Sequence, residues 1–121
     1  MLQIVEVIAV KYPKLVHSWV QKTPISLAIE GEGLTEDGAP AEGATYEGFC
    51  NWQDGGKVVY TANNKVVEIS GRAYFDGDIV PTISNIVGGT AVIFEETREI
   101  LQGFKRRNPD GTVNHTEVQF K

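Results

Sequence analysis

The chain of 121 residues carries 16 acidic and 11 basic side chains, a net charge of −5, and a single cysteine, Cys50. This length suits one domain with a core of its own, and a lone cysteine excludes a scaffold held by internal disulfides. The excess of acids argues against a protein that coats nucleic acid by charge, because phosphate binding needs clustered Lys and Arg.

The N-terminal residues 2–10 are rich in β-branched side chains and predict a strand. They lack the basic start and cleavage site of a signal peptide, and Glu6 interrupts them. No stretch reaches the roughly 18 to 20 apolar residues of a membrane-spanning helix. We therefore expect a protein that is made and kept in the cytoplasm or built into something assembled there, without a membrane partner. A short helix through Val20 is compatible with Pro13 in its first turn.

The next strand is indicated by a clean alternation, in which Ile25, Leu27 and Ile29 are separated by small or polar residues. Residues 31–43 follow, with four glycines, one proline, four acids and no base. This composition predicts a long loop of the functional or mobile kind. Its acidic members are Glu32, Glu36, Asp37 and Glu42.

Residues 45–52 predict a strand with Tyr46, Gly48, Cys50 and Trp52 on one face. Residues 58–61 and 65–75 are β-prone, and an Asn-Asn pair at 63–64 suits the tight turn of a hairpin between them.

After the Asp76-Gly77-Asp78 turn, Pro81 and the glycines at 88–89 bound an irregular segment before a strand over 90–94. Residues 95–97 link this strand to one over 98–107, and Asn-Pro-Asp-Gly at 108–111 is a strong turn signal. The last strand, 112–120, is expected to face inward at Thr116, Val118 and Phe120. Seven or eight short strands and at most one short helix predict a single all-β domain over residues 1–121, a small antiparallel barrel or sandwich with long loops.

Residues able to carry chemistry are scattered. His17, His115 and Cys50 lack metal-ligand spacing, and the pair Asp76 and Asp78 lacks the bidentate acid that a calcium loop needs. Paired carboxylates are available only among glutamates at charged strand ends, which are usually solvated: Glu95, Glu96 and Glu99. We expect no catalytic residue, no metal and no cofactor.

Two charged segments allow alternative interpretations. The basic run Lys105-Arg106-Arg107 can contact a nucleic-acid backbone beside Phe104, or it can be a solvated face whose bases pair with neighbouring acids. The acidic loop at 31–43 can be a plain soluble loop, or it can meet the basic hairpin of another copy head to tail and so close a ring.

The order of several runs carries a resemblance. Cys50–Asp54, Val66–Ile79, the glycines at 88–89 and Ile100–Glu117 are similar, in sequence and order, to small head–tail connector proteins of tailed bacteriophages. These are the head-closure or stopper proteins, often labelled minor capsid proteins. The likeness covers about residues 24–121, and residues 1–23 do not match the short N-termini of that family.

The resemblance implies a virion protein that is not an enzyme and forms a ring beneath the portal, seals the DNA-filled head and receives the tail. Portal or adaptor proteins, tail proteins and passing genomic DNA would be its partners. Its lumen or interface loops would be residues 31–43 and 76–89, which include Asp76 and Asp78. An acidic lumen would repel phosphate and let DNA pass.

Two alternatives stay open. One is a tail-completion or other minor capsid protein. The other is a small barrel that binds a ligand or single-stranded nucleic acid, with aromatic platforms at Trp52, Tyr60, Tyr74 and Phe104.

Overall fold

A computed structural model of the chain describes residues 12–31, 38, 42–55, 58–60 and 66–121. One 3-10 turn and eight strands make up its regular structure, in the order η1 Ser18–Val20, β1 Thr23–Ile29, β2 Ala44–Asp54, β3 Val58–Tyr60, β4 Val66–Glu68, β5 Gly71–Asp76, β6 Gly89–Ile93, β7 Glu96–Arg107 and β8 Val113–Phe120. Within the described part, no helix is long and apolar enough to cross a membrane. The predicted strand over 2–10 lies outside the described residues.

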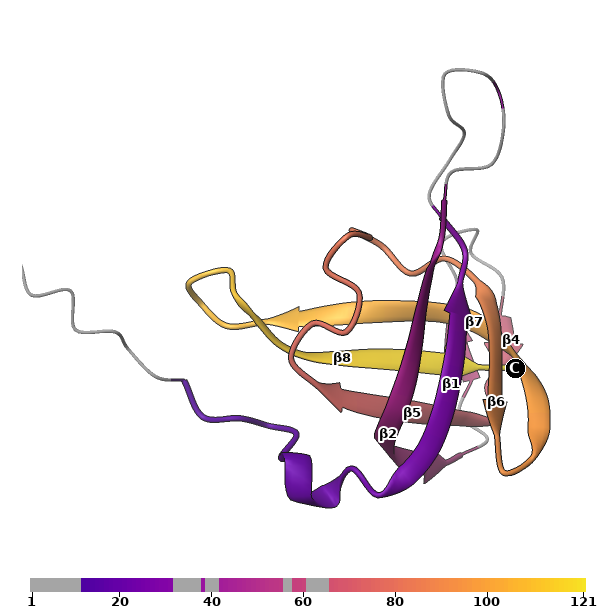
Figure 1. The fold of residues 1–121 in the computed structure, drawn as a ribbon, viewed down its shortest axis with the longest axis horizontal. Coiled ribbons are helices and arrows are strands. Elements are labelled where there is room, and N and C mark those ends of the chain that lie inside the picture. Colours follow the sequence, from indigo (N-terminus) through magenta and orange to yellow (C-terminus); the bar gives the residue numbers. More distant parts are fainter. Residues whose placement is uncertain (1–11, 32–37, 39–41, 56–57, 61–65) are drawn as a thin grey trace, which may run out of the picture.

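Six strands form a closed antiparallel barrel in the order β1-β2-β5-β8-β7-β6 (Figure 1). Strands β3 and β4 make a separate two-stranded sheet, in which Val59 pairs with Val67. The all-β prediction is confirmed, and the barrel is the correct member of the predicted pair of architectures. The expected short helix is only the single 3-10 turn η1.

The barrel interior is filled by the inward residues of its strands. Burial alternates along β1 and β5 as the sequence predicts, with Leu27 and Phe75 almost fully enclosed. The connection between β5 and β6 contributes Val80, Ile83 and Ile86 to the same core. The irregular segment therefore folds back onto the barrel, and the backbone N–H of Gly103 donates to the carbonyl of Ile86 at 2.9 Å.

Strand β8 is buried on both faces, which the sequence did not reveal. Thr116, Val118 and Phe120 are fully enclosed, as predicted. The alternate residues His115, Glu117 and Gln119 are also buried, with exposures of 8%, 7% and 6%. Their cover is polar and comes largely from β7. The Gln102 amide donates to Gln119 at 2.8 Å, the Gln119 amide donates to Glu117 at 2.9 Å, and Arg106 lies 3.5 Å from Glu117.

The predicted strand over 65–75 is interrupted. Strand β4 ends at Glu68 and β5 begins at Gly71, because the Ser70 N–H leaves the ladder and donates to the carbonyl of Phe120 at 2.8 Å. The residues of the predicted Asn-Asn turn lie outside the described part of the chain.

The turns match their predicted chemistry at two places and not at a third. Gly77 and Gly111 have φ of +71° and +91°, the left-handed region that favours glycine. The β6–β7 link, predicted over 95–97, is instead the two-residue turn Phe94-Glu95, and β7 already begins at Glu96. Both turn residues have positive φ, 52° and 61°, although neither is glycine.

Candidate functional site

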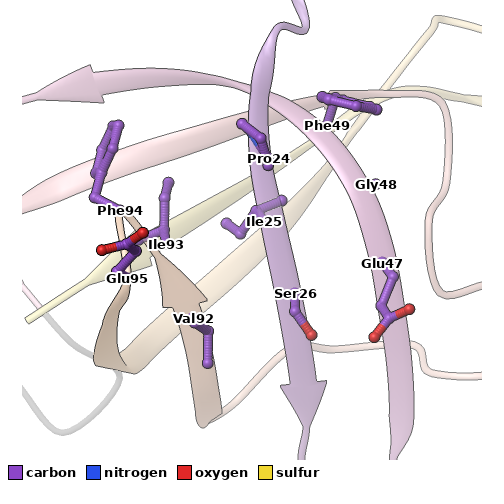
Figure 2. A pocket seen from close by; sticks show the side chains of 10 residues that line it. All are labelled: Pro24, Ile25, Ser26, Glu47, Gly48, Phe49, Val92, Ile93, Phe94 and Glu95. Atoms are coloured by element: carbon purple, nitrogen blue, oxygen red, sulfur yellow. The ribbon is translucent and has the colours of Figure 1, made fainter.

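The outer face of β1, β2 and β6 carries an open groove of about 640 Å³ (Figure 2). The strand register creates it: Pro24 of β1 lies opposite Phe49 of β2, and Ser26 lies between Glu47 of β2 and Val92 of β6. These side chains point outward because their neighbours along each strand point into the core. Ten residues line the groove: Pro24, Ile25, Ser26, Glu47, Gly48, Phe49, Val92, Ile93, Phe94 and Glu95.

The groove is apolar and has an acidic rim. Phe49, Val92 and Phe94 expose 54%, 49% and 56% of their surface. Figure 2 shows the two carboxylates, Glu47 and Glu95, on opposite sides of β1, and no basic side chain is among the lining residues. A concave surface of this kind suits an apolar side chain with nearby positive charge. The polar side chains of the lining are Ser26 and the two glutamates, and the lining includes no His, Cys or Lys.

The ring packing explains the position of Phe94. Its ring meets Trp52 edge to face at 5.9 Å, and Trp52 in turn packs on Phe120 at 5.3 Å. The Arg98 guanidinium lies over Trp52 at 5.3 Å from the ring centre. One wall of the groove is thus supported by a chain of aromatic contacts that reaches the core.

The predicted acidic sites are only partly described. Glu32, Glu36 and Asp37 lie outside the described residues, whereas Glu42 is described and exposed. The other two acids form intrachain ion pairs: Asp76 lies 2.9 Å from Lys14, and Asp78 lies 2.9 Å from Lys105.

The predicted basic run does not form one patch. Lys105 is enclosed and donates to Asp78 and to the carbonyl of Val80, each at 2.9 Å. Arg106 pairs with Glu117 and lies over the Phe104 ring at 4.6 Å, and Arg107 donates to the carbonyl of Gly111 at 2.7 Å. Lys105 and Arg106 thus form ion pairs within the chain, whereas the printed partner of Arg107 is a backbone carbonyl.

The scattered chemical candidates stay separated. His17 is exposed, Cys50 is enclosed in the core, and His115 lies on the outer face of β8. No group of three or more His, Cys, Asp or Glu side chains suited to a metal ion exists among the residues that the structure describes. Burial raises the pKa of the Cys50 thiol to about 12. Burial also lowers the pKa of His115, with Arg106 acting in the same direction and Glu117 opposing it.

The three glutamates considered for acid–base chemistry are all exposed. Glu96 pairs with Arg98 at 3.3 Å, Glu99 pairs with Lys121 at 3.1 Å, and Glu95 lies at the rim of the groove. They do not share an enclosed site.

The candidate stacking rings are engaged within the chain. Trp52 lies between Phe94, Phe120 and Arg98, Phe104 is covered by Arg106, and Tyr74 lies 6.3 Å from the His115 ring. The side chain of Tyr60 is not described.

Sequence reasoning missed the groove, although its signal is present. The alternation that points Cys50 inward also points Phe49 outward, and the same phase exposes Val92 in β6. Two outward apolar residues become a groove only when their strands are close in space, and the position of β1 between β2 and β6 was not predicted. No protein-family model matches the chain, and no curated protein matches its sequence.

Proposed function

We propose that the chain is a structural protein of a bacteriophage virion, a ring-forming head–tail connector of the head-closure type. It would seal the DNA-filled head and join it to the tail, with portal or adaptor proteins on one side and tail proteins on the other. Its role would be to hold surfaces together, and genomic DNA would pass through the ring without sequence-specific contact.

The observation that carries this proposal is that the barrel interior is filled with side chains, whereas its outer face has an apolar groove. The barrel interior holds large enclosed side chains such as Phe75 and Phe120, and the groove lies on its outside. Exposed apolar patches with polar rims are typical of protein–protein contact. The resemblance over residues 24–121 supplies the virion context.

The partly buried ion pair between Lys105 and Asp78 supports the same role. It fastens the β5–β6 connection to β7, and Ile86 pairs with Gly103 in an isolated bridge beside it. A connection fixed at two places gives a rigid building block, which suits a protein that must keep its shape under the pressure of packaged DNA.

Deletion of the gene from the phage genome that encodes the chain tests this function. The proposal expects heads that fail to retain DNA, unattached tails, and recovery of infectious particles when the gene is supplied in trans. Complete infectious particles from the deletion would overturn it. Cross-linking of intact virions then separates the connector from a tail-completion protein: a connector is captured with the portal side, and capture with tail proteins alone would contradict the connector assignment.

A further inference from the structure

A second exposed apolar surface lies on the segment that precedes β1. We call residues 12–22 the arm; it bears Leu15 and Trp19, which expose 70% and 69% of their surface. The arm is held in place, since the Leu15 N–H donates to the Asn114 side chain at 3.2 Å and the Asn114 amide donates to the carbonyl of Pro13 at 2.9 Å. Val16, which is also part of the arm, is buried.

Most of the exposed large apolar side chains belong to these two surfaces. The described residues include seven of them, of which three line the groove and two lie on the arm. The remaining two are Val66 and Val87. The apolar exposure is thus concentrated in one concave and one projecting surface made of different residues.

The charges of the two surfaces are complementary. The arm carries Lys14 and Lys22 and no acid. Lys14 pairs with Asp76 of its own chain, so the charge offered to a second copy is mainly that of the exposed Lys22. The groove carries Glu47 and Glu95 and no base. Rims of opposite charge fix the orientation of two docked copies and disfavour contact between two arms or between two grooves.

We propose that the arm of one copy docks in the groove of the next copy, with the Trp19 ring entering between Phe49 and Phe94. Figure 2 shows these two rings on either side of Pro24. A Trp side chain covers about 150–250 Å² when it is buried, and its flat ring suits a wall built of aromatic and aliphatic residues. Because the two surfaces are different, the contact is head-to-tail and adds copies until a ring closes.

This inference rests on the proposed function and names the contact by which neighbouring copies would meet. The proposed contact and the proposed function are tested by different experiments. Self-association of the purified chain tests the contact, and deletion of the gene tests the function. A ring built through other surfaces would leave the function intact and remove this contact.

The first test is sedimentation velocity of the full chain at concentrations up to about 1 mM. The wild type is expected to form species larger than a dimer as concentration rises. Trp19→Ala and Phe49→Ala should each weaken association by at least about 30-fold, the loss expected for a central aromatic anchor. Val66→Ala and Val87→Ala are matched controls that remove equally exposed side chains outside both surfaces and should associate as the wild type does.

A mixing experiment tests the pairing itself. Trp19→Ala keeps an intact groove and Phe49→Ala keeps an intact arm, so an equimolar mixture should form a one-to-one pair although each variant alone is monomeric. Charge exchange gives a second readout: Glu47→Lys and Lys22→Glu should each weaken association, and mixing the two should restore it in part.

A wild type that stays monomeric throughout this range overturns the proposal. So does self-association that Trp19→Ala and Phe49→Ala leave unchanged, or a mixture that stays monomeric. A wild type that stops at a dimer overturns the head-to-tail arrangement, because a reciprocal pair would then satisfy both surfaces.

Discussion

The ammonium nitrogen of Lys105 lies 2.9 Å from a carboxylate oxygen of Asp78, and only 7% of the Lys105 side chain is exposed. In the sequence the two residues belong to separate charged segments: Asp78 to the predicted lumen or interface loop, and Lys105 to the basic run. In the folded chain they join the β5–β6 connection to β7. Lys105 also donates a hydrogen bond to the carbonyl of Val80 in the same connection.

Lys105→Met should lower the free energy of unfolding by about 1–3 kcal/mol, because it leaves the partly buried Asp78 carboxylate without its ion-pair partner and removes one of the hydrogen bonds to the Val80 carbonyl. Urea denaturation followed by circular dichroism measures this loss. Lys121→Met is the matched control: it breaks a pair whose side chains are 47% and 62% exposed, and it should change stability by less than about 0.5 kcal/mol. Equal losses for the two variants would contradict the structural role of Lys105.

Gly103→Ala should destabilise the chain by about 1–3 kcal/mol through overpacking. A Cβ at this position would lie 2.8 Å from the Cβ of Ile86, too close for two side chains without a shift of the connection. Gly55→Ala adds the same methyl group where no atom lies within 4 Å and should be neutral within about 1 kcal/mol. Thermal unfolding of both variants measures the difference in stability. If Gly103→Ala is as stable as Gly55→Ala, Ile86 does not pack closely against Gly103 of β7.

Cys50 should be nearly inert to thiol reagents in the folded chain. Its pKa of about 12 leaves about one thiolate in ten thousand at pH 8, and the residue is fully enclosed. Reaction with a disulfide reagent should therefore require unfolding by urea. Thr45→Cys adds an exposed thiol on the same strand and supplies the control. In this variant we expect the added thiol to react fast and Cys50 to react slowly. Two fast reactions in the native chain would refute the burial of Cys50.

Stability should fall as the solution is acidified below neutral pH, and His115 should account for part of the fall. Burial lowers its folded-state pKa below the ordinary value of 6.5, so the unfolded chain binds more protons as pH falls through this range. The stability contributed by neutral His115 is then present above about pH 6.5 and lost as pH falls through the folded pKa. Urea titrations at about pH 7.5 and 5.5 should show a smaller fall in His115→Gln than in the wild type. His17→Gln, which removes the other histidine, should keep the wild-type fall; an unchanged fall in His115→Gln would refute the assignment.

The acidic loop supplies a prediction tied to the proposed function. Replacement of Glu32, Glu36, Asp37 and Glu42 by their amides should leave thermal unfolding unchanged, because a loop of the kind that the sequence predicts over 31–43 contributes little to a core. It should alter particle assembly or DNA retention in a deletion strain that carries the variant gene. An unchanged phage titre would contradict a role for these charges.

Local patterns predicted the individual strands well, because alternation directly reports which face of a strand is buried. Leu27 and Phe120 point inward as expected, and the turn at Gly111 lies where its sequence places it. The patterns could not predict which strands are neighbours. The burial of Glu117 illustrates this limit: its cover includes Arg106, whose strand lies beside β8 only in the closed barrel.

The same limit applies to the candidate site. The sequence drew attention to charged runs, and the bases of one of these runs find partners within the chain. The apolar groove went unpredicted because Phe49 and Val92 are 43 positions apart in the sequence (92 − 49) and meet only through β1. Outward apolar residues in separate strands predict a site only after the strand order is known.

The turn at Phe94 and Glu95 lowers the stability of the fold, because both residues have positive φ. Asn-Gly would adopt the same backbone at this position without strain. Left-handed backbone at residues other than glycine costs about 1 kcal/mol or more for each residue. One of these two side chains is a wall of the groove and the other is part of its rim. The contact of the Phe94 ring with Trp52 offsets part of this cost, and under the proposed docking contact the same corner would also shape the surface that meets the next copy.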